Sequence, residues 1–374
     1  MNITDRYRIQ VVAGARPNFM KVAPLVRELK SRSEIEVSLV HTGQHYDQGM
    51  SADFFADLGI PEPDINLEVG SGSHAQQTAK IISSFEPVLM KFNPQVVVVV
   101  GDVNSTIACA LVAVKLGIEV AHVEAGLRSF DRDMPEEINR IMTDSIAHYL
   151  FTTEPEANKN LLAEGIPDSK IFLVGNIMID TLVANLSKSD AVPIIEELGF
   201  KEYSSRFGLL TLHRPSNVDD KKTLERIFDA LREIASLLPI VFPVHPRTKA
   251  RLDEFGLSGQ LTTENGFWCC RPLGYLETLH LCKRSTMVLT DSGGIQEETT
   301  YLGIPCLTIR ENTERLITVT RGTNTLVGRN PQRILTYANQ ILMGGGKKGK
   351  IPDKWNGRTA RRIVDILINS LDKQ

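Results

Sequence analysis

The chain has no long apolar segment. No run of residues approaches the length of a membrane-spanning helix, and the N-terminal stretch MNITDRYRIQVVAG has no apolar stretch behind a basic start. We therefore expect a soluble cytoplasmic protein that has no membrane partner.

An excess of charge of one sign is absent as well. The 374 residues include 42 lysines and arginines against 45 aspartates and glutamates, which gives a formal net charge of -3. Because nucleic acids and anionic surfaces attract strongly basic proteins, this balance argues against both as partners.

Cysteine is scarce. The five cysteines are Cys109, Cys269, Cys270, Cys282 and Cys306. Their number is odd and their spacing lacks the paired pattern of metal ligands. We therefore expect buried or incidental thiols and no metal site.

What the chain does contain is a regular alternation of β-rich and helical patterns. Continuous apolar runs such as QVVVVV are typical of parallel strands that are covered on both faces. In the first half, such runs occupy residues 9–13, 37–41, 95–100, 119–123 and 149–152. In the second half, they occupy residues 207–212, 240–244, 286–290, 306–309 and 325–327. The length favours two domains, and the pattern predicts an α/β protein with two doubly wound sheets in tandem.

The most charged segment of the first half is AHVEAGLRSFDRDMPEEINR at 121–140. Glu124 follows a buried strand, and Pro135 fits the first turn of a helix that would begin with Glu136. Open α/β sheets bind ligands at such strand ends, where two carboxylates can divide acid and base roles. The alternative is an ordinary helix start with solvated acids.

Two further segments of the first half end strands with polar side chains. The segment GDVNST directly follows the five-valine run and places Asp102 at the carboxyl end of a buried strand, a position that favours a functional carboxylate over a helix cap. In VVAGARPNFMK, Arg16 and Lys21 lie near a helix start that is disposed to bind anions. This segment matches neither the Walker loop nor the dinucleotide fingerprint.

The second half has comparable features. His213 and Arg214 end one strand, where they suit a phosphate or a leaving-group oxygen, and His245 ends the next. The sequence LTDSGGIQEETTYLG places glycines at a helix start, where bare amides can approach a diphosphate, and Glu298 about one turn further on, where it can accept hydrogen bonds from a ribose.

Together, these motifs resemble one known family. The segments GARPNFMK, HTGQHYDQGM, GDVNST, HVEAGLRS, MPEEINR, LHRPSN and LTDSGGIQEE occur in the order found in the non-hydrolysing UDP-N-acetylglucosamine 2-epimerases. The resemblance implies the GT-B architecture, which has two Rossmann-like domains, an inter-domain active-site cleft and a last helix that returns to the first domain. The corresponding domains are residues 1–170 with 356–374, and the UDP-binding residues 171–355.

The resemblance also implies a mechanism without a cofactor, in which UDP is eliminated to a 2-acetamidoglucal and then added back. By position, the family's catalytic residues are Asp102, Glu124, Glu136 and His213. Its nucleotide-binding residues are Arg16, Lys21, Arg140, Ser292, Gly293, Gly294 and Glu298. The remaining acids of the segment, Asp131, Asp133 and Glu137, are expected to have ordinary roles. Relatives are commonly homodimers.

Departures from the family pattern concern regulation and the sugar. In well-known members an arginine downstream of the QH motif belongs to an allosteric substrate site, whereas here the segment LEVGSGSHAQQT contains no arginine. Gln44 and Gln48 are present and, with His245, are the candidate regulatory residues. The GARP start and the glycine-rich, histidine-containing segment look more like relatives that act on UDP-2,3-diacetamido-2,3-dideoxyglucuronate.

Three other activities compete with this interpretation. A hydrolysing 2-epimerase would release UDP and free sugar, a GT-B glycosyltransferase would share the sheets and the nucleotide site, and a sensor would bind without reaction. The joint presence of Asp102, Glu124 and Glu136 argues against the last two, because neither needs acids and bases directed at C2 of the sugar.

Overall fold

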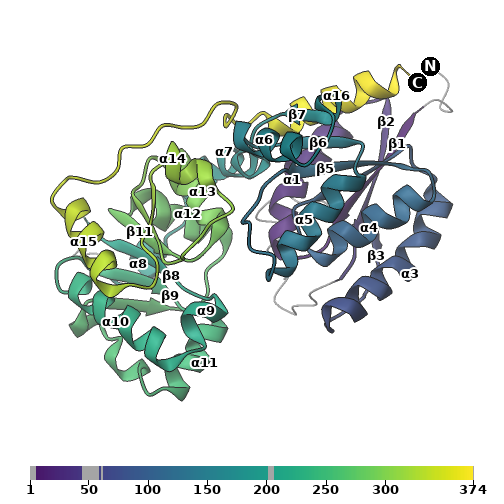
Figure 1. Ribbon diagram of the computed structural model, residues 1–374. Coiled ribbons are helices and arrows are strands. Elements are labelled where there is room, and N and C mark those ends of the chain that lie inside the picture. The colour runs from purple at the N-terminus through teal and green to yellow at the C-terminus, as the bar shows by residue number, and fades with distance from the viewer. Residues whose placement is uncertain (1–5, 44–58, 60–61, 201–205, 374) are drawn as a thin grey trace. The chain divides into compact units, whose positions relative to one another are not determined.

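The chain folds into two compact units. The computed structural model describes residues 6–43, 59, 62–200 and 206–373. Unit 1 comprises Met1–Ala184 and Asp353–Gln374, and unit 2 comprises Asn185–Pro352 (Figure 1). Unit 1 includes residues 171–184, which the sequence assigned to the second domain, because the strand that begins at Ile171 pairs within the first sheet.

Unit 1 is built on a parallel sheet. Its strands are β1 (Tyr7–Ala13), β2 (Ile35–His41), β3 (Ile65–Asn66), β4 (Val96–Val100), β5 (Glu119–Ala125), β6 (Tyr149–Thr152) and β7 (Ile171–Leu173). Their order in the sheet is β3-β2-β1-β4-β5-β6-β7. The central strand β4 consists of five valines, all buried, as expected of a parallel strand that has helices on both faces.

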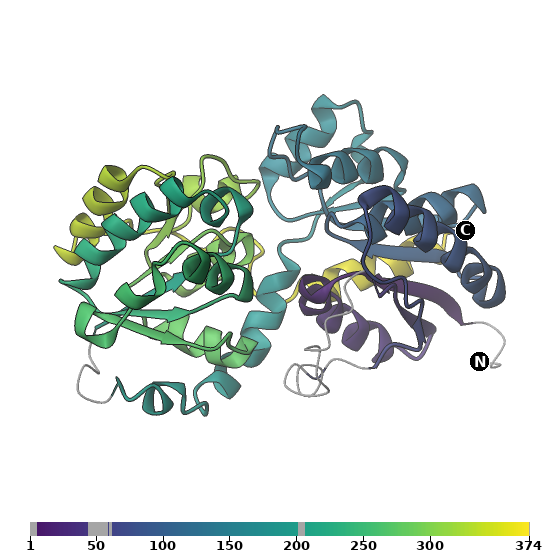
Figure 2. The ribbon, with the colours of Figure 1, turned by 90° about the horizontal axis from the view of Figure 1, so that it is seen from below.

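Helices cover both faces of this sheet. They are α1 (Arg16–Lys30), α3 (His74–Phe92), α4 (Asn104–Lys115), α5 (Pro135–Ile146), α6 (Pro155–Ala163) and α16 (Thr359–Leu371). Helix α7 (Ile177–Ser189) begins in unit 1, and its residues from Asn185 onward belong to unit 2. Helices α3, α4 and α5 pack in sequence on one face, and α1 pairs with α16 on the other (Figure 2). Because right-handed crossovers run in opposite directions from β1 and from β4, their helices fall on opposite faces.

The C-terminal segment is fastened to unit 1 by buried contacts. Trp355 is 2% exposed, and its indole Nε1 donates to the Thr153 carbonyl at 3.1 Å. Asp180 of α7 accepts hydrogen bonds from the first amides of α16, at 3.0 Å from Thr359 and 2.8 Å from Ala360. A residue distant in sequence thus caps this helix.

Unit 2 has a second parallel sheet. Its strands are β8 (Gly208–Thr211), β9 (Ile240–Pro243), β10 (Phe267–Cys270), β11 (Met287–Thr290), β12 (Cys306–Thr308) and β13 (Asn324–Leu326), in the order β10-β9-β8-β11-β12-β13. Its helices are α8 (Ile194–Glu197), α9 (Pro215–Val218), α10 (Lys221–Ala235), α11 (Pro246–Glu254), α12 (Tyr275–Arg284), α13 (Gly293–Leu302), α14 (Leu316–Thr320) and α15 (Pro331–Leu342). The prediction of two doubly wound parallel sheets is confirmed.

Each sheet reverses its winding at one pair of strands. In unit 1 the pair is β1 and β4, and in unit 2 it is β8 and β11. The loops that leave such a pair diverge, and open α/β sheets bind ligands in the opening between them. Of the residues that the structure describes, none forms a helix long and apolar enough to cross a bilayer.

Candidate active site

Glu124 lies at the carboxyl end of β5 in an unusual backbone conformation. Its φ is 73°, in the left-handed region that non-glycine residues rarely adopt, and the β5–β6 register shifts between Val123 and Ala125. Such conformations persist only where the surroundings enforce them. Because of this bulge, the Glu124 side chain does not follow the regular alternation of side chains between the two faces of the sheet.

The Glu124 carboxylate is buried and paired with Lys21 of α1. Only 2% of the Glu124 side chain and 11% of the Lys21 side chain are exposed, and the ion pair joins Nζ to Oε2. Loss of either partner would leave a buried charge, at a cost of about 3–5 kcal/mol. A Cβ atom on Gly101 would lie 3.3 Å from this ammonium and 3.6 Å from this carboxylate, so the pair rests against bare backbone.

Asp102 follows β4 at the end of the neighbouring strand. Its side chain is 31% exposed and forms an ion pair with Arg140 of α5. Strands β4 and β5 are adjacent in the sheet, so Asp102 and Glu124 leave the same edge. The two carboxylates differ in environment, because one is partly hydrated and the other is enclosed.

Arg140 is held by Glu137, an acid for which the sequence suggested only an ordinary role. The Arg140 guanidinium donates to Glu137 Oε2 at 2.5 Å from Nη2 and 2.9 Å from Nε. Glu137 also accepts the backbone amides of Ser129 at 3.0 Å and Phe130 at 2.9 Å. Burial acts to raise the pKa of Glu137, but the Ser129 amide and Arg140 outweigh it, so that the pKa lies below its usual range. Glu137 therefore orients the guanidinium that contacts Asp102.

Glu136 lies in the first turn of α5, next to Glu137 but on a different side of the helix. The residues of α5 that are buried include Glu137, Arg140 and Asp144, which share one face. Glu136 is half-buried and makes no hydrogen bond or ion pair with the part of the chain that the structure describes. It is thus available to a ligand.

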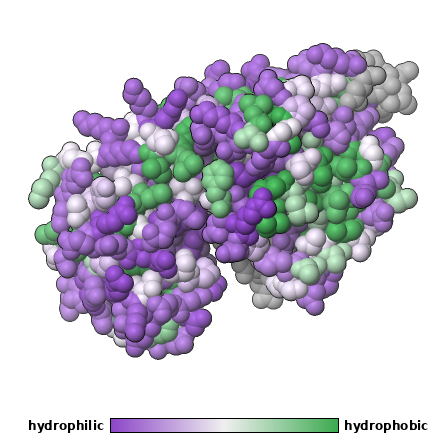
Figure 3. All heavy atoms as spheres, viewed as in Figure 1, coloured by the Kyte–Doolittle hydropathy of each residue, from purple (hydrophilic) through white to green (hydrophobic). Residues whose placement is uncertain are grey.

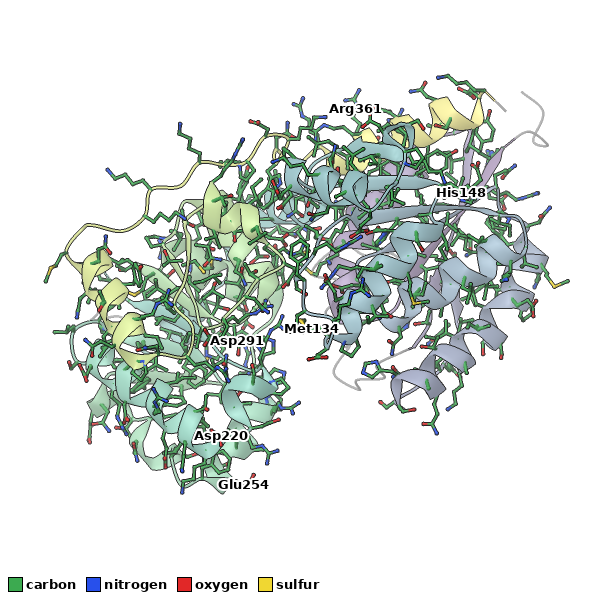
Figure 4. All side chains as sticks on the ribbon, in the orientation of Figure 1. Met134, His148, Asp220, Glu254, Asp291 and Arg361 are labelled. Atoms are coloured by element: carbon green, nitrogen blue, oxygen red, sulfur yellow. The ribbon has the colours of Figure 1, made fainter. Side chains whose placement is uncertain are left out.

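Unit 2 presents a second group of polar residues, around Asp291 at the end of β11 (Figure 4). Asp291 is fully buried and accepts the amides of His213 and Arg214 at 2.9 Å and 2.8 Å. Its other oxygen lies 2.8 Å from the His213 ring nitrogen Nδ1. Burial acts to raise the pKa of Asp291, but the His213 ring and these amides hold it below the usual range.

His213 itself is accessible. Its side chain is 39% exposed, and with Nδ1 at Asp291 its Nε2 is the nitrogen that can serve a phosphate oxygen. The His245 ring packs near it, with centroids 5.4 Å apart, and His245 Nδ1 caps α11 by accepting the Arg247 amide at 3.2 Å.

The SGG turn begins α13 next to β11. Ser292 is the N-cap residue, but its hydroxyl does not cap the helix, so the first amides face outward from the turn. A Cβ atom on Gly293 would lie 2.9 Å from a Glu314 carboxylate oxygen, and Glu314 is paired with Arg310 at 2.9 Å. A larger residue at 293 would therefore displace the Glu314 carboxylate from its present position.

Glu298 lies inside α13 and is almost completely buried. Burial raises the pKa of Glu298 to about 7, the neighbouring Tyr275 hydroxyl opposes that shift, and Glu297 adds to it. The carboxyl group is therefore close to half-ionised at neutral pH before any ligand binds.

Several buried residues that contact the candidate site residues were not identified from the sequence. The sequence pattern indicated a turn residue at Asp291 and an ordinary acid at Glu137. It gave no indication that His122 and Asp144 form a buried pair, with Nδ1 and Oδ1 2.6 Å apart. Of the sequence candidates, Gln44 and Gln48 lie outside the described residues, as does the side chain of Arg16, the first residue of α1. The structure gathers Asp102, Glu124, Lys21 and Arg140 in unit 1, and His213 with the SGG turn in unit 2.

Comparisons with known proteins agree with the family resemblance. The sequence model of the family described as UDP-N-acetylglucosamine 2-epimerase matches residues 27–368. The UDP-N-acetylglucosamine 2-epimerase of Methanocaldococcus jannaschii is 45% identical over 363 residues, which cover 96% of this chain and 98% of the relative. The UDP-2,3-diacetamido-2,3-dideoxy-D-glucuronate 2-epimerase of Pseudomonas aeruginosa is 40% identical over 339 residues, 90% of this chain and 92% of the relative.

A solved structure extends the likeness to three dimensions. The crystal structure of the Methanocaldococcus jannaschii UDP-GlcNAc 2-epimerase in complex with UDP-GlcNAc and UDP superimposes with a TM-score of 0.87 at 45% identity. The match covers 97% of this chain and 99% of that chain. The fold predicted from the sequence, two Rossmann-like domains of the GT-B type, is confirmed.

Proposed function

Because the chain belongs to the UDP-N-acetylglucosamine 2-epimerase family, we propose that it interconverts UDP-N-acetylglucosamine and UDP-N-acetylmannosamine. The C2 proton of the sugar is not acidic, so the configuration is inverted through elimination. A base removes the C2 proton, the C1–O bond breaks and its electron pair leaves with UDP. The resulting 2-acetamidoglucal is protonated at C2 from the opposite face as UDP returns to C1.

The observation that carries this proposal is the pair of carboxylates at the ends of β4 and β5. Asp102 is partly exposed and Glu124 is enclosed, and environments that differ in this way allow two acids to take different proton-transfer roles. Glu136 is the third acid of the set. Lys21 pairs with Glu124, and Arg140 pairs with both Asp102 and Glu137.

The features of unit 2 support binding of the UDP group. The amides that begin α13 suit the diphosphate, Glu298 suits the ribose hydroxyls, and His213, held by Asp291, suits the phosphate oxygen that leaves C1. No cofactor is needed, because elimination and re-addition leave the oxidation state of the sugar unchanged overall.

Product analysis tests the proposal. Incubation with UDP-N-acetylglucosamine should give an equilibrium mixture of two UDP-linked sugars, which chromatography separates. Free N-acetylmannosamine with stoichiometric UDP would indicate a hydrolysing enzyme, and an unchanged donor would contradict the proposed activity.

Substitution of the acids tests their roles. Asp102→Asn and Glu136→Gln should each abolish epimerisation, because each removes a proton-transfer group. UDP affinity should stay close to that of the unaltered protein. Asp133→Asn, an exposed acid of the same segment, is the matched control and should keep full activity. Loss of UDP binding in both Asp102→Asn and Glu136→Gln would instead make these acids structural.

A second candidate substrate is UDP-2,3-diacetamido-2,3-dideoxyglucuronate. The Pseudomonas aeruginosa relative that bears this name is 40% identical over most of the chain. The comparison to make is kcat/KM for the two donors under the same conditions. A higher value for the diacetamido donor would assign the enzyme to that substrate without altering the reaction.

We further propose a homodimer formed through α3, α4 and α5. Helix α5 buries charged residues but exposes Ile138 and Met142, and Met90 of α3 and Leu116 at the end of α4 are also exposed. Figure 3 shows apolar residues gathered over this part of unit 1. Met142→Lys should shift the mass measured by light scattering toward that of a monomer. Met343→Lys, at an exposed methionine of unit 2, should not.

The proposed reaction also bears on the cellular compartment and the pathway. We propose that the enzyme works in the cytoplasm and supplies UDP-sugars for surface polysaccharide or cell-envelope synthesis.

A further inference from the structure

A line of four polar side chains runs through the interior of unit 1. Arg128 binds Glu164 at 2.7 Å from Nε and binds Asp144 at 2.7 Å from Nη2. Asp144 in turn lies 2.6 Å from His122 Nδ1. The side chains of Arg128, Asp144 and His122 are at most 1% exposed. The large majority of buried polar atoms in proteins have a hydrogen-bond partner of the complementary kind.

Both ring nitrogens of His122 face acceptors that cannot donate. Nδ1 meets the Asp144 carboxylate, and Nε2 lies 2.8 Å from the Gly101 carbonyl oxygen. A neutral imidazole carries one N–H, so one of its nitrogens would direct a lone pair at an oxygen lone pair. Only the imidazolium, with a proton on each nitrogen, satisfies both contacts.

The charges of the neighbouring side chains also favour a protonated His122. Glu164, Arg128 and Asp144 carry negative, positive and negative charge in turn, so a cationic His122 completes an alternating, neutral set. With a neutral ring, the set would carry a net negative charge, and the fully buried Asp144 would share its one cation, Arg128, with Glu164.

His122 and Asp144 each contact a backbone group close to one of the two candidate carboxylates, Asp102 and Glu124. His122 holds the carbonyl of Gly101, the residue before Asp102. The second oxygen of Asp144 accepts the amide of Gly126, two residues after Glu124, at 3.0 Å. Glu124, between these two contacts, has a φ of 73°, a conformation that a non-glycine residue keeps only where its surroundings enforce it.

We propose that His122 is a positioning residue, held as an imidazolium between Asp144 and the Gly101 carbonyl, that fixes Asp102 and Glu124 relative to each other. The proposal rests on the proposed function, since these carboxylates act on substrate only in that reaction. His122 does not touch the substrate. It acts through the peptides that carry the two acids.

The charge state is measured on the unaltered full chain. NMR of the protein with isotope-labelled histidine should show protons on both His122 ring nitrogens at neutral pH, with the resonances assigned from their loss in His122→Gln. A single ring proton would overturn the proposal. This result does not depend on whether the protein is an epimerase, so it separates failure of the inference from failure of the proposed function.

Kinetics test the positioning role. His122→Gln keeps a donor for the Gly101 carbonyl but loses the charged contact with Asp144. We expect kcat to fall about 100-fold, the effect of a displacement of about 1 Å in a catalytic group, with KM and UDP affinity unchanged. Free 2-acetamidoglucal and UDP should also be released, because a displaced acid delays protonation at C2 after UDP has left C1.

The matched control is His148→Gln. His148 lies between the end of α5 and the start of β6 (Figure 4). Its Nδ1 accepts the Val120 amide at 3.1 Å, near the start of β5. This variant should keep wild-type kcat. An unchanged kcat in His122→Gln, or a fall in stability and in UDP binding that accounts for its lost activity, would overturn the positioning role. If His122→Gln does not fold, His122→Asn replaces it in the kinetics, and its absent resonances provide the NMR assignment.

Discussion

Two glycines of unit 1, Gly101 and Gly117, share a left-handed backbone but have different surroundings. Their φ angles are 71° and 74°. A Cβ atom on Gly101 would meet Lys21 Nζ at 3.3 Å and Asn18 Nδ2 at 3.4 Å, whereas a Cβ atom on Gly117 would meet nothing within 4 Å. Substitutions at these two glycines therefore distinguish the cost of backbone strain, which both share, from displacement of Lys21, which only Gly101 would cause.

Substitution by alanine exploits this difference. Gly101→Ala and Gly117→Ala should each lower the free energy of unfolding by about 1–2 kcal/mol, the cost of a left-handed alanine. Only Gly101→Ala should also lower kcat, because its methyl group displaces the Lys21 ammonium from Glu124. Denaturant titration and steady-state kinetics check both parts. Equal activity in the two variants would mean that the contact with Lys21 has no catalytic role.

The buried Glu298 predicts pH-dependent binding. Burial raises the pKa of this carboxyl to about 7, and only its ionised form can accept the two hydroxyls of a ribose diol at both of its oxygens. Below about pH 7 the group must lose a proton for binding, so affinity for UDP-N-acetylglucosamine should fall by up to about tenfold per pH unit. Above about pH 7 it should level off.

Calorimetry in the inactive Glu136→Gln background measures this dependence without turnover. Glu298→Gln in the same background should bind with little dependence on pH. Titrations in buffers of different ionisation enthalpy detect protons that are released on binding. This release should be absent in the variant that carries Glu298→Gln. A flat profile for the protein that retains Glu298 would show that this carboxyl does not change ionisation when the ligand binds.

The positions of the candidate residues were predictable where a residue follows a strand, and unpredictable where burial depends on which face of a helix a residue occupies. Asp102 and Glu124 follow apolar runs that the sequence displays directly. Glu136 and Glu137 are adjacent, and only the packing of α5 shows that the second is buried against Arg140. His122 looks like any residue of a strand, because its partner Asp144 comes from a different element.

At the scale of elements, continuous apolar runs predicted most strands closely. The runs at 149–152 and 119–123 correspond to β6 (Tyr149–Thr152) and to most of β5 (Glu119–Ala125). The sequence missed β10 (Phe267–Cys270), a four-residue edge strand that has neither a long apolar run nor alternation. The terminal helix α16 begins and ends where its amphipathic pattern does, at Thr359 and Leu371.

The attachment of α16 depends on Asp180. The side chain accepts two amides of the first turn of α16, so Asp180→Ala should lower the free energy of unfolding by about 1–2 kcal/mol, as the loss of a strong helix cap does. Asp168→Ala, at an exposed acid of unit 1, is the control and should change it little. Equal unfolding curves for the two variants would show that α16 is held by its apolar face alone.

At the scale of the whole molecule, the two units repeat one plan. Each has a parallel sheet in which the first and fourth strands of its core are neighbours, and each carries its candidate residues on the loops that leave those strands or the next. The alternation of strands and helices made this plan predictable from sequence. The side-chain network that supports the carboxylates was not, since it joins β5 to α5 and to residues far along the chain.

The proposed reaction requires that C2 of a UDP-linked sugar exchanges its proton while the nucleotide is transiently released from C1. The most direct measurement is NMR of UDP-N-acetylglucosamine incubated with the enzyme in deuterated water. We predict that deuterium replaces the C2 proton in both UDP-linked epimers as the manno product appears. A manno product that retains the C2 proton, or a donor that neither exchanges nor epimerises, would contradict it.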